Sequence, residues 1–305
     1  MTFSIVALDA RTGRVGAAVA AATFAVGATA VHVRAGAGAV VAQGGASHHA
    51  GNALLNKLAG GASPEELVEK YAGVEAHAGD QVAVLRIDGR LAAFTGSECE
   101  PYAGHAAATA ACTQGVLLAS GRIPQAMLDA FDDRGGRLEA KLAAALRAGQ
   151  DLGGDVRGQR SAALMVVPGD PSAGHHGGPG DPYVDLRVDD DVDAVGALAR
   201  LVVRHEANEY LLRSAAPGRS DEERAEDARA AFALAPDDPL LRVGVVVVLS
   251  RAGARDEAEP IIDLIVAEGA ARGVAARLRY RADVGLEPQD ANFWWLLRRL
   301  EKAGP

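Results

Sequence analysis

The chain has 305 residues, of which 49% are hydrophobic but only 4% aromatic, and its formal net charge is −9. This length exceeds that of a usual single domain and predicts two domains, while the apolar content excludes a disordered chain. The basic residues are scattered among Asp and Glu, which excludes the cationic stripe that nucleic-acid binding needs, so we expect no nucleic-acid partner.

The N-terminal segment predicts a β-hairpin. Residues 2–8 are rich in β-branched and aromatic side chains, residues 9–13 read as a turn, and residues 14–20 alternate weakly. Charged residues interrupt this apolar start and no cationic segment precedes it, so it lacks the pattern of a secretion signal. The weakly apolar run 15–31 is too short and too rich in Ala and Gly for a membrane span, and it predicts two strands. We therefore expect a cytoplasmic protein with no membrane partner.

Strands and helices then alternate in blocks. The expected order is strands at 29–34 and 39–43, helices at 47–60 and from Ser63, strands at 81–87, 90–96 and 112–120, helices after Pro124 and at 138–148, and strands at 161–167 and 183–188. The second helix has the clearest start, because Ser63 and Glu66 have the spacing of a capping box and Pro64 fits the first helical position. Blocks of strands between helix pairs are typical of antiparallel sheets flanked by helices. We predict an α/β (α+β) fold, a four-layer α/β/β/α sandwich.

The C-terminal third shows continuous helix signals. The segment SAAPGRS, residues 214–220, has the composition of a linker. We expect the domain boundary between residues 205 and 220, with the sandwich over residues 1–205 and an all-α domain over residues 206–305.

Part of the all-α domain has a repeat-like pattern. Residues 238–269 weakly resemble a tetratricopeptide-type helix pair but lack its usual aromatics. The run Val245 to Val248 favours a strand by propensity, and we assign it to a helix because tertiary context overrides propensity. A generic helix bundle explains the pattern equally well. We expect these helices to carry a protein partner or a homo-oligomer contact, and no catalytic site.

Five phrases of the first 191 residues resemble the bacterial and archaeal family called domain of unknown function 1028 (DUF1028). They are TFSIVALDARTGRVGAAVA, CEPYAGH, TQGVLLAS, GGDVRGQRSAALMVV and GGPGDPYVDLRVDDD, which occur in collinear order. The resemblance implies the sandwich of the Ntn (N-terminal nucleophile) hydrolase-like proteins. It does not imply a specific reaction, because the reaction of the family is not settled.

The resemblance gives Thr2 a chemical role. Removal of Met1 would make Thr2 the N-terminus, with a hydroxyl and a free α-amine on one residue. In Ntn hydrolases such a residue attacks an amide carbonyl while its α-amine accepts the proton. The implied activity is hydrolysis of a small amide or acyl-amino substrate, with no cofactor and no metal. Ser4 would share Thr2's face of the strand and orient the amine or a water. Alternatively, Ser4 is an ordinary polar residue of the strand with no catalytic role.

Five further residues are site candidates. Arg34 stands where the resembling proteasome subunits carry a cationic Lys, although an Arg stabilises charge without shuttling protons. Gly44 and Gly45 form a turn before a helix, where we expect an oxyanion hole. The resemblance assigns Asp155 and Arg157 to the site, paired with each other and with the new amino terminus or a substrate carboxylate. A purely structural role is open for each of them.

Three residues that differ from the family pattern favour a second interpretation of the function. The family usually has Asn where this chain has Val116, Gln where it has Arg160, and Trp where it has Tyr102. Loss of an amide side chain would alter or abolish activity. A catalytically silent scaffold or binding protein therefore stays open as the alternative function.

A metal-dependent hydrolase is a third hypothesis for the function. The histidine pairs at 48–49 and 175–176, with Asp181 or Asp185, contain ligand-type residues. Adjacent histidines rarely bind the same ion, and no carboxylate stands at the helical spacing of strong zinc motifs. We therefore expect no metal, and we expect His105 to be a hydrogen-bonded structural residue. The two cysteines are too isolated for a metal site or a disulfide framework.

Overall fold

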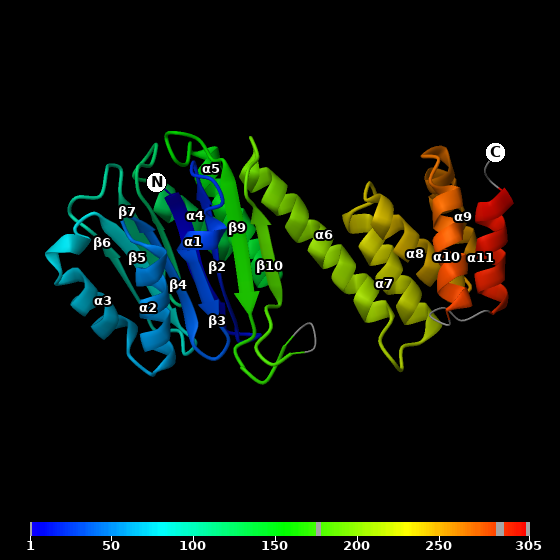
Figure 1. The fold of residues 1–305 in the computed structure, drawn as a ribbon, viewed down its shortest axis with the longest axis horizontal. Helices are drawn as coiled ribbons and strands as arrows, with labels where there is room; N and C mark the ends of the chain where they lie inside the picture. The colour runs from blue at the N-terminus through cyan, green and yellow to red at the C-terminus, as the bar shows by residue number, and fades with distance from the viewer. Residues whose placement is uncertain (1, 175–177, 285–289, 303–305) are drawn as a thin grey trace. The chain divides into compact units, whose positions relative to one another are not determined.

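The computed structural model describes residues 2–174, 178–284 and 290–302, which fall into two compact units, 1–202 and 203–305. The first unit contains two antiparallel β-sheets with helices, and the second is helical (Figure 1). The division falls inside helix α6 (Ala194–Ser214). The segment 214–220, expected as the interdomain linker, joins α6 to the next helix within the second unit.

One sheet, called sheet A, has six strands in the spatial order β10-β9-β2-β1-β8-β7. Their bounds are Val184–Val188, Ser161–Val167, Arg14–Ala21, Thr2–Asp9, Ala111–Gly115 and Gly104–Ala108. The predicted N-terminal hairpin is present, with Thr2 opposite Ala21. Because β8 pairs with the other edge of β1, the first strand of the chain lies inside the sheet.

The other sheet, called sheet B, has four strands in the order β3-β4-β5-β6. Their bounds are Val31–Arg34, Gly38–Gly44, Asp80–Arg86 and Leu91–Thr95. In the run predicted as two strands, β2 is followed instead by a short helix α1 (Gly27–Ala30) before β3. A Cβ on Gly27 would lie 2.3 Å from Ala163 Cβ, so the close packing of α1 on sheet A requires glycine here.

Helices cover the outer face of each sheet, which confirms the predicted α/β/β/α layering (Figure 1). The helices α2 (His48–Ala59) and α3 (Pro64–Ala72) pack on sheet B. On sheet A lie α4 (Ile123–Asp133), α5 (Leu138–Asp151) and the start of α6. Ser63 caps the start of α3 as predicted, with its Oγ accepting a hydrogen bond from Glu66 N at 3.2 Å. A short 3₁₀ helix, η1 (Glu75–His77), leads into β5.

The layer between the sheets is built from small side chains. Its buried members include Val6, Ala17, Ala39, Ala83 and Cys112. Such residues let two sheets approach closely with few aromatics in the core. Burial raises the pKa of the Cys112 thiol to about 12, which keeps that thiol protonated and unreactive.

The second unit contains five helices after α6 among its described residues. They are α7 (Asp221–Leu234), α8 (Pro239–Arg251), α9 (Arg255–Ala267), α10 (Ala271–Asp283) and α11 (Ala291–Lys302). The Val-rich run 245–248 is helical, as expected, because it packs in the core of this unit. Of the helices in the described part of the chain, none combines the length and hydrophobicity that crossing a membrane takes.

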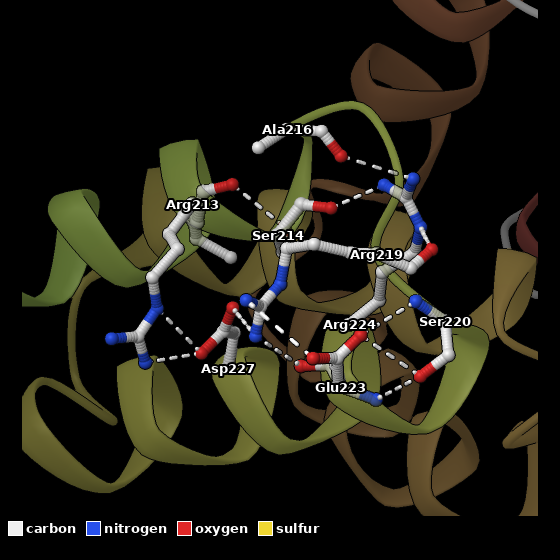
Figure 2. A network of polar contacts seen from close by, with 9 residues as sticks. Arg213, Ser214, Ala216, Arg219, Ser220, Glu223, Arg224 and Asp227 are labelled. Atoms are coloured by element: carbon white, nitrogen blue, oxygen red, sulfur yellow. Dashed lines mark hydrogen bonds and ion pairs between the residues drawn. The ribbon is translucent and has the colours of Figure 1, made fainter.

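An arginine network closes the turn between α6 and α7 (Figure 2). The carboxylate of Asp227 is only 2% exposed and accepts a hydrogen bond from Arg213 Nε at 2.9 Å. Arg219 Nη2 lies 2.8 Å from the other carboxylate oxygen. Arg224 donates to the carbonyl oxygens of Ser214 and, at 3.2 Å, of Ala216. These contacts hold the turn against the first helix pair of the unit, because a buried carboxylate needs cationic partners.

We predict that Asp227→Asn destabilises the helical unit by about 2 kcal/mol, because two arginines then face a neutral group in a partly buried place. Both tryptophans of the chain lie in α11, so urea unfolding followed by tryptophan fluorescence reports on this unit. The exposed Glu226→Gln on the same helix is the control and should change stability little. Equal effects of the two variants would contradict a role for the network.

Candidate active site

Thr2 begins β1 inside sheet A. Its backbone is paired with Val116, whose N–H donates to Thr2 O at 3.0 Å. Side chains alternate along a strand, and Phe3 belongs to the core under α4 and α5. Thr2 and Ser4 therefore share the opposite face, as the sequence predicted, and that face looks toward sheet B. Thr2 is 5% exposed.

Gln43, at the end of β4, connects the two sheets beside Thr2. Its Oε1 accepts a hydrogen bond from Ser4 Oγ at 2.7 Å. Its Nε2 donates to the backbone oxygen of Thr2 at 3.1 Å and to Gln81 Oε1 at 2.7 Å. All three side chains are buried. Ser4 thus acts on Thr2 through Gln43, and the pair fixes the position of the Thr2 carbonyl.

Gln81 extends this network toward the surface. Its Nε2 lies 2.9 Å from Thr95 Oγ1 and close to the carbonyl oxygens of Gly104 and Gly115, at 3.0 and 3.1 Å. Thr95 Oγ1 in turn lies 2.9 Å from His105 Nδ1, and the two form a hydrogen bond. His105 is thereby hydrogen-bonded, as expected, and burial lowers the pKa of its imidazole, which favours the neutral ring.

Asp155 and Arg157 form an ion pair at the same end of the sandwich. The carboxylate, 1% exposed, accepts hydrogen bonds from Arg157 Nε at 3.1 Å and Nη2 at 2.9 Å. It also accepts one from the N–H of Ala22 at 3.4 Å, the residue after Ala21, which stands opposite Thr2. The hydrogen bond with Asp155 raises the pKa of Arg157. The pair predicted from the sequence therefore forms, and it lies near Thr2.

The two glycines of the expected oxyanion hole follow Gln43 directly. Gly44 has a φ of +74°, a conformation that favours glycine. The N–H of Gly45 donates to Gly79 O at 2.9 Å, so this group is engaged inside the protein. The structure thus brings Gly44 and Gly45 next to the network but leaves Gly45 N–H committed to another acceptor.

Arg34 is not brought to Thr2. It pairs with Gly38 at the start of β4, whereas Gln43 stands five residues further along that strand. At about 3.3 Å per residue the two positions are roughly 17 Å apart. Arg34 Nη2 instead donates to Asn56 Oδ1 of α2 at 2.8 Å. The order of the strands in the sequence does not reveal which end of β3 lies nearer to Thr2.

Sequence reasoning missed the side chains of Gln43, Gln81 and Thr95. A signal was present, because Gln43 follows the apolar run of β4, Gln81 precedes the apolar run of β5, and the two stand opposite each other in the sheet B ladder. A buried polar side chain needs hydrogen-bond partners. Two glutamines at facing positions thus indicate a polar cluster, but only the sheet register shows that they face each other.

The three departures from the family pattern have different surroundings. Val116 is 1% exposed beside Thr2, so an apolar group stands where the family usually has an amide. Arg160 forms an exposed ion pair with Asp190 at 2.5 Å. Tyr102 is 58% exposed. Val116 is therefore the departure with the most direct bearing on Thr2.

The histidines considered above as possible metal ligands contact other groups where the structure describes them. His48 contacts Thr29 O at 3.3 Å and Asn52 Nδ2 at 2.7 Å, while His32 contacts Asn52 Oδ1 at 3.2 Å. The pair 175–176 lies outside the described residues. Within the described ranges, no three or more His, Cys, Asp or Glu residues form a group that could hold a metal ion.

Comparison with known proteins identifies a family and a similar solved structure. The model of a family of unknown function, DUF1028, matches residues 2–198. The crystal structure of a protein from Silicibacter pomeroyi, described as a DUF1028 protein, is 29% identical, with a TM-score of 0.58, covering 73% of this chain and 94% of that one. A search of curated proteins finds no match.

We predict that His32 makes the sandwich less stable at acidic pH. Burial, followed by repulsion from His48, lowers the pKa of His32. As the pH falls below about 6.5, the unfolded chain therefore binds a proton before the folded chain does, and the free energy of unfolding decreases. Calorimetric unfolding between about pH 5 and 8 should show a flatter pH dependence for His32→Gln than for the exposed control His49→Gln. Identical profiles would contradict the assignment.

We predict that Gln43→Leu destabilises the sandwich by roughly 2–4 kcal/mol, since it keeps the volume but leaves Ser4 Oγ and Gln81 Oε1 without a partner and removes one of the two hydrogen bonds to Thr2 O. Hydrogen exchange of β1 and β4, read by mass spectrometry, should show faster opening. Ser4→Ala should cost less in the Gln43→Leu background than in the wild type. Additive effects would argue against coupling.

Proposed function

Because this chain belongs to the DUF1028 family, and the family model spans nearly all of the sandwich unit, we propose that it is an N-terminal-nucleophile amidohydrolase. Thr2 is the nucleophile, made the N-terminus by removal of Met1. The substrate is a small amide or acyl-amino compound.

One observation carries the proposal: hydrogen bonds fix the backbone of Thr2, whereas its hydroxyl has no hydrogen bond among the described residues. Gln43 and Val116 bind the backbone oxygen of Thr2. Among the described residues, no group hydrogen-bonds Thr2 Oγ1. A nucleophile needs a fixed backbone and an uncommitted reacting atom. This arrangement supports Thr2 as the reacting residue.

The proposed reaction has two steps. Thr2 Oγ1 attacks the amide carbonyl carbon, and the α-amine of Thr2 accepts the hydroxyl proton directly or through a water. That proton is then given to the departing amine as the C–N bond breaks, which leaves an ester on Thr2. A water, deprotonated by the same α-amine, attacks the ester, and the acid product leaves as the hydroxyl regains its proton. An α-amine with a pKa near about 8 suits this work at neutral pH.

Arg157 supplies a charge for the substrate in this scheme. Its guanidinium is partly exposed while Asp155 is buried beneath it, which leaves one side of the cation toward solvent. An arginine held by a buried carboxylate is oriented and loses little entropy when it binds an anion. The carboxylate of an acyl-amino acid is the group that we assign to it.

A catalytically silent scaffold is the second candidate. The apolar Val116 beside Thr2, where the family usually has Asn, favours it. A missing amide at this place removes a hydrogen-bond donor that would orient substrate or water. The experiment below separates the two candidates.

We predict that Thr2→Ala abolishes activity and covalent labelling while changing the free energy of unfolding by at most about 1 kcal/mol, because only one hydroxyl is lost. The assay is a panel of acyl-amino acids and small amides, with an amide-mimicking electrophile whose attachment site is mapped by mass spectrometry. Thr2→Ser should retain partial activity.

An uncleavable extension before Thr2 is the matched control. It keeps the hydroxyl but converts the basic amine into an amide, so activity should disappear. Intact mass must show that Met1 is absent from the active protein. Turnover by a form that retains Met1, or labelling of Cys99, would remove Thr2 from the mechanism. No labelling and no turnover would favour the scaffold.

A further inference from the structure

The helical unit contains a groove along three of its helices. The groove has a volume of about 390 Å³, within the range of ligand-binding clefts. It is lined by Leu211 of α6, by Leu240, Val243, Gly244, Val247, Val248 and Arg251 of α8, and by Val274, Arg277, Leu278 and Arg281 of α10. Its walls therefore combine aliphatic side chains with three arginines.

The aliphatic part of the groove is accessible to a ligand. Leu240, at the start of α8, is 72% exposed. Gly244 sets the local shape, because a Cβ at this position would lie 2.7 Å from Leu211 Cδ1. The groove is thus formed where α6 and α8 approach each other closely.

The three arginines of the groove come from α8 and α10. Arg277 and Arg281 are one helical turn apart on α10, and Arg251 ends α8. Burial lowers the pKa of Arg251, and repulsion from Arg281 and Arg224 adds to this while Asp290 opposes it. Arg251 and Arg281 already have interaction partners within the protein. Arg277 has no ion-pair partner among the described residues, and it is the cation that the experiment addresses.

We propose that this groove binds an acidic peptide segment with aliphatic side chains, supplied by a partner protein. Carboxylates complement the arginines, and aliphatic side chains complement the valines and leucines beside them. The lining residues include no aromatic ring on which a nucleic-acid base would stack. The groove belongs to the second unit and Thr2 to the first, and the proposal does not depend on the proposed hydrolysis.

The experiment measures binding of three fluorescein-labelled hexapeptides to the full chain by fluorescence anisotropy. The first alternates Glu with Leu or Val, the second replaces Glu by Gln, and the third replaces Leu and Val by Ser. We expect saturable binding of the first and at least tenfold weaker binding of the other two. Arg277→Glu should weaken binding of the first peptide at least tenfold, and Leu240→Asp should weaken it as well.

Arg272→Glu is the matched control, because Arg272 is an exposed arginine of the same helix outside the groove. It should leave binding within twofold of wild type. No saturable binding of the acidic peptide, equal binding of the Gln peptide, or equal losses in Arg272→Glu and Arg277→Glu would overturn the proposal. Tryptophan fluorescence of the variants, read from α11, establishes that the unit is folded in each case.

Discussion

The hydrogen bond from Ser4 Oγ to Gln43 Oε1 joins the two sheets at the point where the chain begins. A polar group buried between sheets is costly unless it has a partner. A slip of β1 by one residue would turn Ser4 toward α4 and α5 and bring Phe3 between the sheets. This pairing therefore constrains the register of the strand, the face on which Thr2 lies and the distance between the sheets.

Small side chains make this pairing possible. Ala17, Ala39 and Ala83 occupy the layer between the sheets, where larger residues would hold the sheets further apart. At a close separation, Gln43 and Gln81 reach across from sheet B to backbone oxygens of sheet A. The polar network thus depends on the alanine-rich composition, because only closely spaced sheets allow these side chains to reach the backbone beside Thr2 and fix its position.

Local signals account for what the sequence predicted well. The N-cap at Ser63 and the β-branched and aromatic side chains of β1 each depend on residues close together in the chain. They were sufficient for the order of most elements and for the layered sandwich. The pairing of Asp155 with Arg157 followed from a family resemblance and involves residues two apart, which also makes it a local contact.

The strand β7 (Gly104–Ala108) was missed because GHAAA contains no β-branched residue, and only its pairing with β8 makes it a strand. The same kind of long-range pairing decided the site. Arg34 lies at the far end of sheet B from Gln43, and Gln81 lies opposite Gln43, because the ladders of β4 with β3 and β5 put them there. Most of the elements, their order and the face of β1 that carries Thr2 and Ser4 could be predicted from the sequence, since these depend on neighbours along the chain. Only the tertiary structure decided which polar side chains meet at Thr2, since that depends on register between strands that are about 40 residues apart in the chain.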